Sequence, residues 1–137
     1  EDIYTTISYG IRSTHEETRV NDMPAFLKDE LLTKAEIEDV VTYAQSLSDR
    51  SIKATESGRV LFADNCALCH GEDGKGLREF GAPNLTDAIT LYVTDRDSMI
   101  DIVSNSRKGV MPTWSGRLDE ATIKSLAIYI HSLGGGE

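Results

Sequence analysis

Two thiols and an imidazole stand together in the run Cys66-Ala67-Leu68-Cys69-His70, which holds the only two cysteines of the chain. Thiols at this spacing can add to the two vinyl groups of one porphyrin, and the adjacent imidazole can then bind the iron as an axial ligand. The competing interpretation is a redox-active or disulfide-forming C-x-x-C pair, but it leaves His70 without a role. The pattern therefore predicts one covalently attached haem c, with His70 as a metal ligand.

The chemistry of a haem depends on its sixth ligand, because a second strong ligand favours electron transfer and an open position favours gas binding or catalysis. Met111 lies 41 residues after His70, and the proline that follows it holds the backbone out of a helix. We predict that its thioether is the second axial ligand; an ordinary core methionine is the alternative. Weaker rivals are Met99, in a predicted helix over 97–107, and His131, near the end of the last helix.

Other residues are expected to complete a haem pocket. An axial imidazole needs an acceptor for its second nitrogen, and the carbonyl of Pro83, thirteen residues after His70, is the predicted acceptor. A plain turn is the alternative for Pro83. Trp114 and Arg107 are candidates to meet the haem propionates, whereas solvated surface charge is the stronger interpretation of Lys108. Three glycines are expected to let the chain wrap the porphyrin edge: Gly71, Gly74 and Gly76.

The elements around the motif are expected to be helical, because their apolar residues recur at helical spacing and no run alternates well enough to be a strand. One helix is predicted over residues 51–65, ending at the haem motif, and a last helix after the N-cap residue Asp119. Gly134, Gly135 and Gly136 are predicted to end the last helix. Gly58 would let another helix pack closely on the first, with an aromatic contact between Phe62 and Tyr129. These features predict an all-α fold.

The chain also contains an internal repeat. Residues 31–47 match residues 117–133 at a constant offset of 86, with six identities in seventeen positions. The helix starts correspond as well, and Thr33 of the first copy forms a predicted capping box with the glutamate three residues later. Upstream, residues 23–26 correspond to residues 111–114, with two extra residues in the first copy. Both of these shorter segments begin with Met-Pro.

Two explanations of the repeat compete. We favour an amino-terminal truncation of a two-haem protein, in which Met23 would bind a first haem whose attachment motif precedes residue 1. The alternative is a first domain that has lost its haem and kept a helix for packing. In the chain as given, Met23 is expected to be only structural or mobile. Residues 1–48 are expected to dock only partly, with weak protection of Val40 and Val41, because half a domain cannot bury its apolar helix alone.

Several segments carry a family resemblance: Ser8-Tyr9-Gly10-Ile11-Arg12-Ser13, Thr18-Arg19, Met23-Pro24-Ala25-Phe26, residues 66–75, residues 81–87, Gly109-Val110-Met111-Pro112 and residues 130–137. Through them the whole chain resembles the carboxy-terminal part of the dihaem cytochrome c subunit (CcoP) of cbb3-type haem–copper oxidases. The resemblance implies a partial first cytochrome c domain in residues 1–50 and a complete class I cytochrome c domain in residues 51–137. The family's membrane anchor and first haem motif are not in this chain.

The resemblance implies electron transfer through haem c. Such a subunit takes electrons from a donor cytochrome c and passes them towards the catalytic subunit, which reduces oxygen. The implied partners are the other oxidase subunits, and a second haem c is expected in the full-length protein. The implied location is the periplasmic side of the bacterial inner membrane. No catalytic site is expected in this chain, so any oxidase activity would belong to the complex.

The composition limits the alternatives. The chain has 14 Lys and Arg against 23 Asp and Glu, a net charge of −9, which argues against nucleic acid as a partner. No apolar run approaches the roughly 20 residues that a membrane-spanning helix needs. Two other functions stay open: a free-standing periplasmic carrier cytochrome, and a haem sensor or enzyme with an open sixth position.

Overall fold

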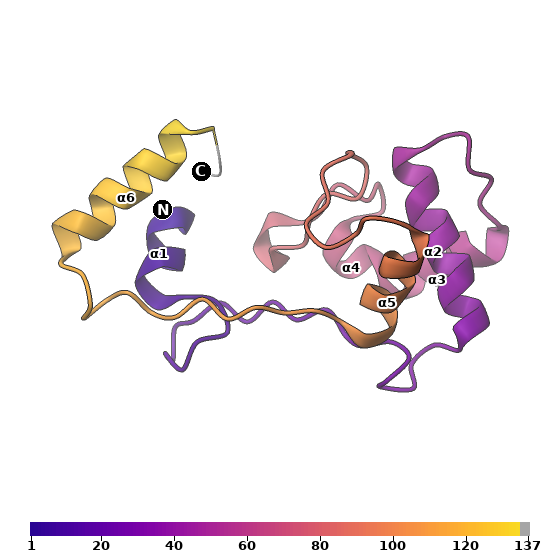
Figure 1. Ribbon diagram of the computed structural model, residues 1–137, viewed down its shortest axis with the longest axis horizontal. Coiled ribbons are helices and arrows are strands. Elements are labelled where there is room, and N and C mark those ends of the chain that lie inside the picture. Colours follow the sequence, from indigo (N-terminus) through magenta and orange to yellow (C-terminus); the bar gives the residue numbers. More distant parts are fainter. Residues whose placement is uncertain (135–137) are drawn as a thin grey trace. The chain divides into compact units, whose positions relative to one another are not determined.

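A computed structural model of the chain describes residues 1–134, and its fold is helical (Figure 1). The helices are α1 (Asp2–Tyr9), α2 (Lys34–Ser48), α3 (Glu56–Asn65), α4 (Ala67–His70), α5 (Arg96–Asn105) and α6 (Glu120–Ser132), with a short 3-10 helix, η1 (Arg78–Phe80). The described residues contain isolated β-bridges but no strand. The all-α prediction is confirmed.

The chain divides into two compact units, which are described separately below. The larger unit is the continuous segment 23–107, and it contains α2 to α5. The smaller unit joins residues 1–22 to the chain from residue 108 on, and it contains α1 and α6. The predicted domains 1–50 and 51–137 follow the sequence repeat and not these contacts, and they stay a prediction.

Helix α2 forms the centre of the larger unit. It begins at the predicted capping box, in which Thr33 Oγ1 accepts from the backbone N–H of Glu36 and the Glu36 carboxylate accepts from the Thr33 N–H. One face then packs against α3 and α5. The core that results is a cluster of six buried residues: Phe26, Leu32, Ile37, Val40, Val41 and Phe62.

The burial of α2 corrects the expectation that residues 1–48 dock only partly. Val41 is 0% exposed and Val40 is 2% exposed, so both lie in the core. The expectation was wrong because it assumed that the first repeat must cover its helix alone. Instead, α3 and α5 of the second repeat supply the apolar surface.

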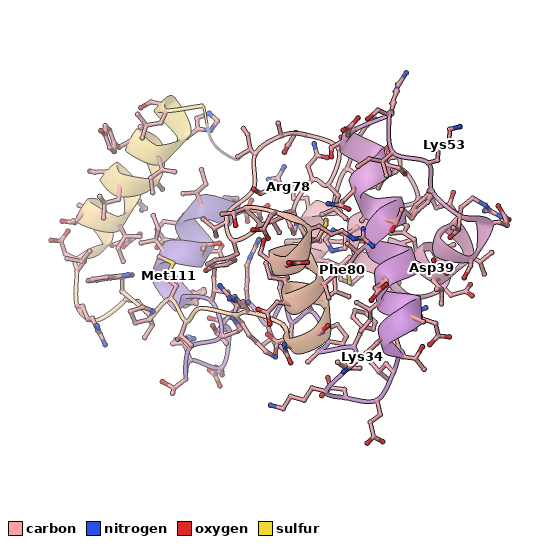
Figure 2. All side chains as sticks on the ribbon, turned by 45° about the vertical axis from the view of Figure 1, so that its right-hand side comes forward. Lys34, Asp39, Lys53, Arg78, Phe80 and Met111 are labelled. Carbon is pink, nitrogen blue, oxygen red and sulfur yellow. The ribbon has the colours of Figure 1, made fainter. Side chains whose placement is uncertain are left out.

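The crossing of α2 and α3 depends on a glycine. A Cβ atom at Gly58 would clash with the carbonyl oxygen of Asp39, a residue of α2 that Figure 2 labels. The close approach expected at Gly58 is therefore present. The Phe62 ring contacts Tyr43, with 5.1 Å between ring centroids and an interplanar angle of 49°. The aromatic partner expected from the sequence was Tyr129; within the larger unit, Tyr43, its counterpart in the repeat, fills this role, and Tyr129 is 61% exposed.

In the smaller unit, α6 packs on α1 (Figure 1, yellow and indigo). Asp119 is the N-cap of α6 as predicted, and its carboxylate accepts from the N–H of Thr122. Ile7 of α1 and Ile123 of α6 are buried. The Trp114 N–H lies 3.3 Å from the Ile7 carbonyl oxygen and 3.2 Å from that of the next residue, which ties the segment before α6 to the end of α1.

Two predicted helix boundaries need correction. The helix predicted over 51–65 begins only at Glu56, because the Thr55 side chain accepts from the Gly58 N–H and thereby caps it. The helix predicted over 97–107 is α5, which ends at Asn105 because Ser106 adopts a φ of 58°.

No helix in the described part of the chain has the length and apolar character needed to cross a bilayer. Two of the glycines predicted to end the last helix, Gly135 and Gly136, lie outside the described residues.

Candidate haem site

The C-x-x-C-H residues form one helical turn at the end of α3. The Cys66 N–H donates to the Phe62 carbonyl at 2.8 Å, which continues the hydrogen bonding of α3. The His70 N–H then donates to the Cys66 carbonyl at 2.9 Å. Residues three and four apart lie on one face of a helix, so the two thiols and the imidazole share a side. Cys66 and Cys69 are free thiols and are half-buried.

The imidazole of His70 is held by a backbone carbonyl. Its Nδ1 lies 3.0 Å from the carbonyl oxygen of Pro83. Because a carbonyl only accepts, Nδ1 carries the proton in this contact and the lone pair of Nε2 is left for a metal. Burial lowers the pKa of His70, and the Pro83 hydrogen bond opposes that effect. The contact expected from the sequence is present, and its role towards a haem stays a prediction.

Gly76 brings the Pro83 loop to the histidine. Its φ is 81°, and a Cβ atom there would clash with the carbonyl oxygen of Ala82. The Gly76 N–H also donates to the His70 carbonyl at 2.7 Å, so the loop turns back directly after the motif. From the sequence we expected Gly76 only to let the chain wrap the porphyrin edge, and this close approach was not predicted. The only available signal was the glycine itself.

The surroundings of the motif fit a porphyrin. Burial, followed by the charge of Cys69, raises the pKa of the Cys66 thiol to about 11, so this thiol is protonated. A porphyrin is a flat and largely apolar group, and it needs apolar side chains that are free to cover it. The segment from the motif to residue 92 leaves several of these exposed: Leu68, Leu77, Phe80, Ile89, Leu91 and Tyr92. Figure 2 labels Phe80 of this set, in η1.

The three methionines have different surroundings. Met99 packs against the core of the larger unit, as expected for a residue inside a helix. Met23 also packs against this core and belongs to the same unit as His70. Met111, labelled in Figure 2, belongs to the smaller unit, where its backbone exchanges two hydrogen bonds of 3.0 Å with Ile11. The larger unit thus contains His70 and Met23, and the assignment of Met111 as an axial ligand stays a prediction.

The residues predicted to meet the propionates have protein partners. Arg107 lies 3.1 Å from the carboxylate of Asp101. The guanidinium carbon of Arg117 lies 5.7 Å from the centroid of the Trp114 ring, in a cation–π contact. Lys108 is paired with Asp22 at 2.9 Å, in agreement with a surface charge. The propionate roles of Arg107 and Trp114 stay predictions. His131 stands in the last turn of α6, as expected.

An all-α chain whose C-x-x-C-H turn presents two free thiols and an oriented imidazole has the features of a c-type cytochrome. Residues 53–130 match the family model described as cytochrome C oxidase, cbb3-type, subunit III. The chain therefore belongs to the family of cbb3-type cytochrome c oxidase subunit III. Membership of this cytochrome family implies haem c, and the two cysteines stand at the spacing that its attachment requires.

Curated relatives match the chain over its whole length. It is 51% identical over 140 residues to the cbb3-type cytochrome c oxidase subunit CcoP of Cereibacter sphaeroides, covering 100% of this chain and 48% of that protein. It is 49% identical over 140 residues to the subunit FixP of Bradyrhizobium sp. strain ORS 278, with the same coverage. A CcoP subunit of Rhodobacter capsulatus is 48% identical over 149 residues, covering 100% and 50%. The chain spans about half the length of these relatives.

Proposed function

We propose that this chain carries single electrons through a haem c attached at Cys66 and Cys69, as part of the cytochrome subunit of a cbb3-type oxidase. The observation that carries the proposal is the contact of 3.0 Å between His70 Nδ1 and the Pro83 carbonyl. It fixes the tautomer and the orientation of the ring that follows the two cysteines, and it leaves Nε2 as a ligand.

Each group of the site has a separate task. The thiols of Cys66 and Cys69 would hold the haem covalently, and Nε2 of His70 would be a ligand of its iron. When bound, haem c supplies a one-electron couple between Fe(III) and Fe(II). A methionine thioether as the other ligand would close the iron to oxygen and would favour its reduced state relative to a second histidine. Met111 is the methionine predicted for this position, from its distance of 41 residues to His70 and the proline that follows it.

The wider role follows from the family. A CcoP-type subunit would receive electrons from a donor cytochrome c and deliver them to the other oxidase subunits, at the periplasmic side of the inner membrane. In the full-length protein a second haem c would take part in this relay. The net charge of −9 favours docking to basic surfaces. No catalytic residue is assigned to this chain, so the reduction of oxygen would occur in another subunit.

Optical spectra of the purified chain, taken oxidised and reduced together with a haem count, test the electron-transfer site. We expect one covalent haem per chain that is low-spin in both states and shows the weak near-infrared methionine–iron band when oxidised. It should also reduce and reoxidise reversibly by one electron. A high-spin haem that binds carbon monoxide would contradict the proposal and favour a sensor or an enzyme.

Association with the oxidase core separates a subunit from a free-standing carrier. The full-length protein that contains this chain should co-purify with the catalytic subunit and restore its reduction by a donor cytochrome c. A matched variant with Cys66→Ala and Cys69→Ala should still associate but should not restore reduction, because it lacks the attached haem. Failure of the unmodified full-length protein to associate would favour the free carrier.

A further inference from the structure

The contacts of the larger unit reveal an exchange between the two repeats. The segment that follows Met23 docks on the end of α5, where the Phe26 N–H donates to the Val103 carbonyl at 3.0 Å. The Ser106 hydroxyl, just beyond α5, donates to the Met23 carbonyl at 2.8 Å. The methionine segment of the first repeat is therefore attached to the helix that precedes the methionine of the second repeat.

The smaller unit shows the reverse pairing. The Trp114 N–H donates to the Ile7 carbonyl at 3.3 Å, and Trp114 is the repeat counterpart of Phe26. Ile7 corresponds in turn to Val103, because residues 7–8 read Ile-Ser and residues 103–104 read Val-Ser, 96 positions later. Both of these serines are buried. The segment of Met111 is thus attached to the helix that precedes Met23, by the same kind of contact.

The close approaches after these two helices match as well. Gly10 follows α1 with a φ of 78°, and a Cβ atom there would clash with the Met111 carbonyl oxygen. Ser106 occupies the corresponding place after α5 with a φ of 58°, and it contacts the Met23 carbonyl. Both sets of contacts therefore pair the Met-Pro segment of one repeat with the helix that precedes the methionine of the other repeat.

We propose that Met23 is a second axial methionine, able to replace Met111 on the haem attached at His70. The proposal rests on the proposed function, since it requires haem at this motif. Met23 belongs to the compact unit of His70, and it packs against the core that Cys66 and Leu85 also border. The helix that follows it, α2, is seated on α3 through Gly58 and the Tyr43–Phe62 contact. Exchange of the segment thus carries a thioether into the unit that holds His70.

Leucine replacements of the methionines test this inference on the haem-loaded chain. Leucine has nearly the volume of methionine but cannot bind a metal, so the variants Met23→Leu and Met111→Leu should still fold. We expect Met111→Leu to keep the near-infrared methionine–iron band and to stay closed to carbon monoxide, because Met23 supplies the ligand. The double variant should lose the band and bind carbon monoxide. Met99→Leu is the matched control and should keep the band.

Two outcomes would overturn the inference. One is a Met111→Leu variant that loses the band as completely as the double variant does. The other is a double variant that keeps the band, since the ligand would then be neither methionine. Either result would leave the proposed electron-transfer site standing, provided that the unmodified chain shows the band. An unmodified chain without the band would instead contradict the proposed function. The helix content of each variant, measured by circular dichroism, verifies that it has folded.

Discussion

The two repeat helices, α2 and α6, have similar sequences but very different surroundings. In α2 four residues of the apolar face are buried, and Ile37 among them is 1% exposed. In α6 only Ile123 is buried, whereas Tyr129 and Leu133 are largely exposed. The difference lies in the partners, because α2 packs on both α3 and α5, whereas α6 packs on α1. An apolar helical face predicts that a helix is buried, but not which element buries it.

The largest expected effect comes from truncating the covered face of α2. Ile37→Ala leaves a cavity in the core cluster and should lower the free energy of unfolding by about 2–5 kcal/mol. The comparison in α6 is Ile128→Ala, at a residue of the same type that is 70% exposed, and it should change stability by no more than about 0.5 kcal/mol. The repeat counterpart of Ile37 is Ile123, which is buried and is therefore left unchanged. Chemical denaturation of the haem-loaded variants measures both losses. Equal losses would contradict the difference in exposure between Ile37 and Ile128.

The second largest effect is expected where α2 crosses α3. Gly58→Ala places a methyl group against the Asp39 carbonyl, so α2 and α3 must move apart at a cost of about 1–3 kcal/mol. Gly109→Ala is the control, because nothing lies within 4 Å of a Cβ atom at that position. Thermal unfolding of both variants gives the comparison. A Gly58→Ala variant as stable as the unmodified chain would show that α2 does not cross α3 at this point.

The third effect should be alike in the two helices, since both are capped by a side chain. Thr33→Ala and Asp119→Ala each remove an acceptor for a backbone N–H and should each cost about 0.5–2 kcal/mol. Urea denaturation followed by circular dichroism measures the losses. A much smaller loss for Asp119→Ala would indicate that α6 is frayed at its start, which would extend the difference between the helices beyond their apolar faces.

The smallest effect is a pH dependence at the start of α2. Hydrogen bonds from Thr33 lower the pKa of Glu36 below its ordinary value of 4.5. Because the folded-state pKa is the lower one, this contribution is fully present above pH 4.5 and is lost as the pH falls through the folded value. Glu36→Gln, which keeps a side-chain acceptor but does not titrate, should flatten the acid limb of the stability curve. An unchanged acid limb in that variant would argue against the Glu36 contribution.

Local features could be predicted because the residues that interact are close to one another along the sequence. The capping box at Thr33, the N-cap at Asp119 and the contact between His70 and Pro83 all join residues at most thirteen positions apart. The start of α3 at Glu56 was missed because Thr55 caps the helix five residues into the predicted span.

The sequence could not show which of the two repeat helices, α2 or α6, packs on α3. Phe62 needs an aromatic neighbour across the crossing, and both Tyr43 and Tyr129 stand at the position that provides one. The two helices share six of seventeen residues, so local pattern does not distinguish them. The choice depends on contacts outside the repeat helices, such as the docking of Phe26 on the end of α5.

Hydrogen exchange of the haem-loaded chain tests most directly whether α2, the helix of the first repeat, is the helix that packs on α3. We expect the amides of Val40 and Val41 to exchange only through global unfolding, because they lie in the core. The corresponding amides of Leu126 and Ala127 should exchange faster, by local opening of α6. Slower exchange at Leu126 and Ala127 than at Val40 and Val41 would show instead that α6, not α2, lies in the protected core.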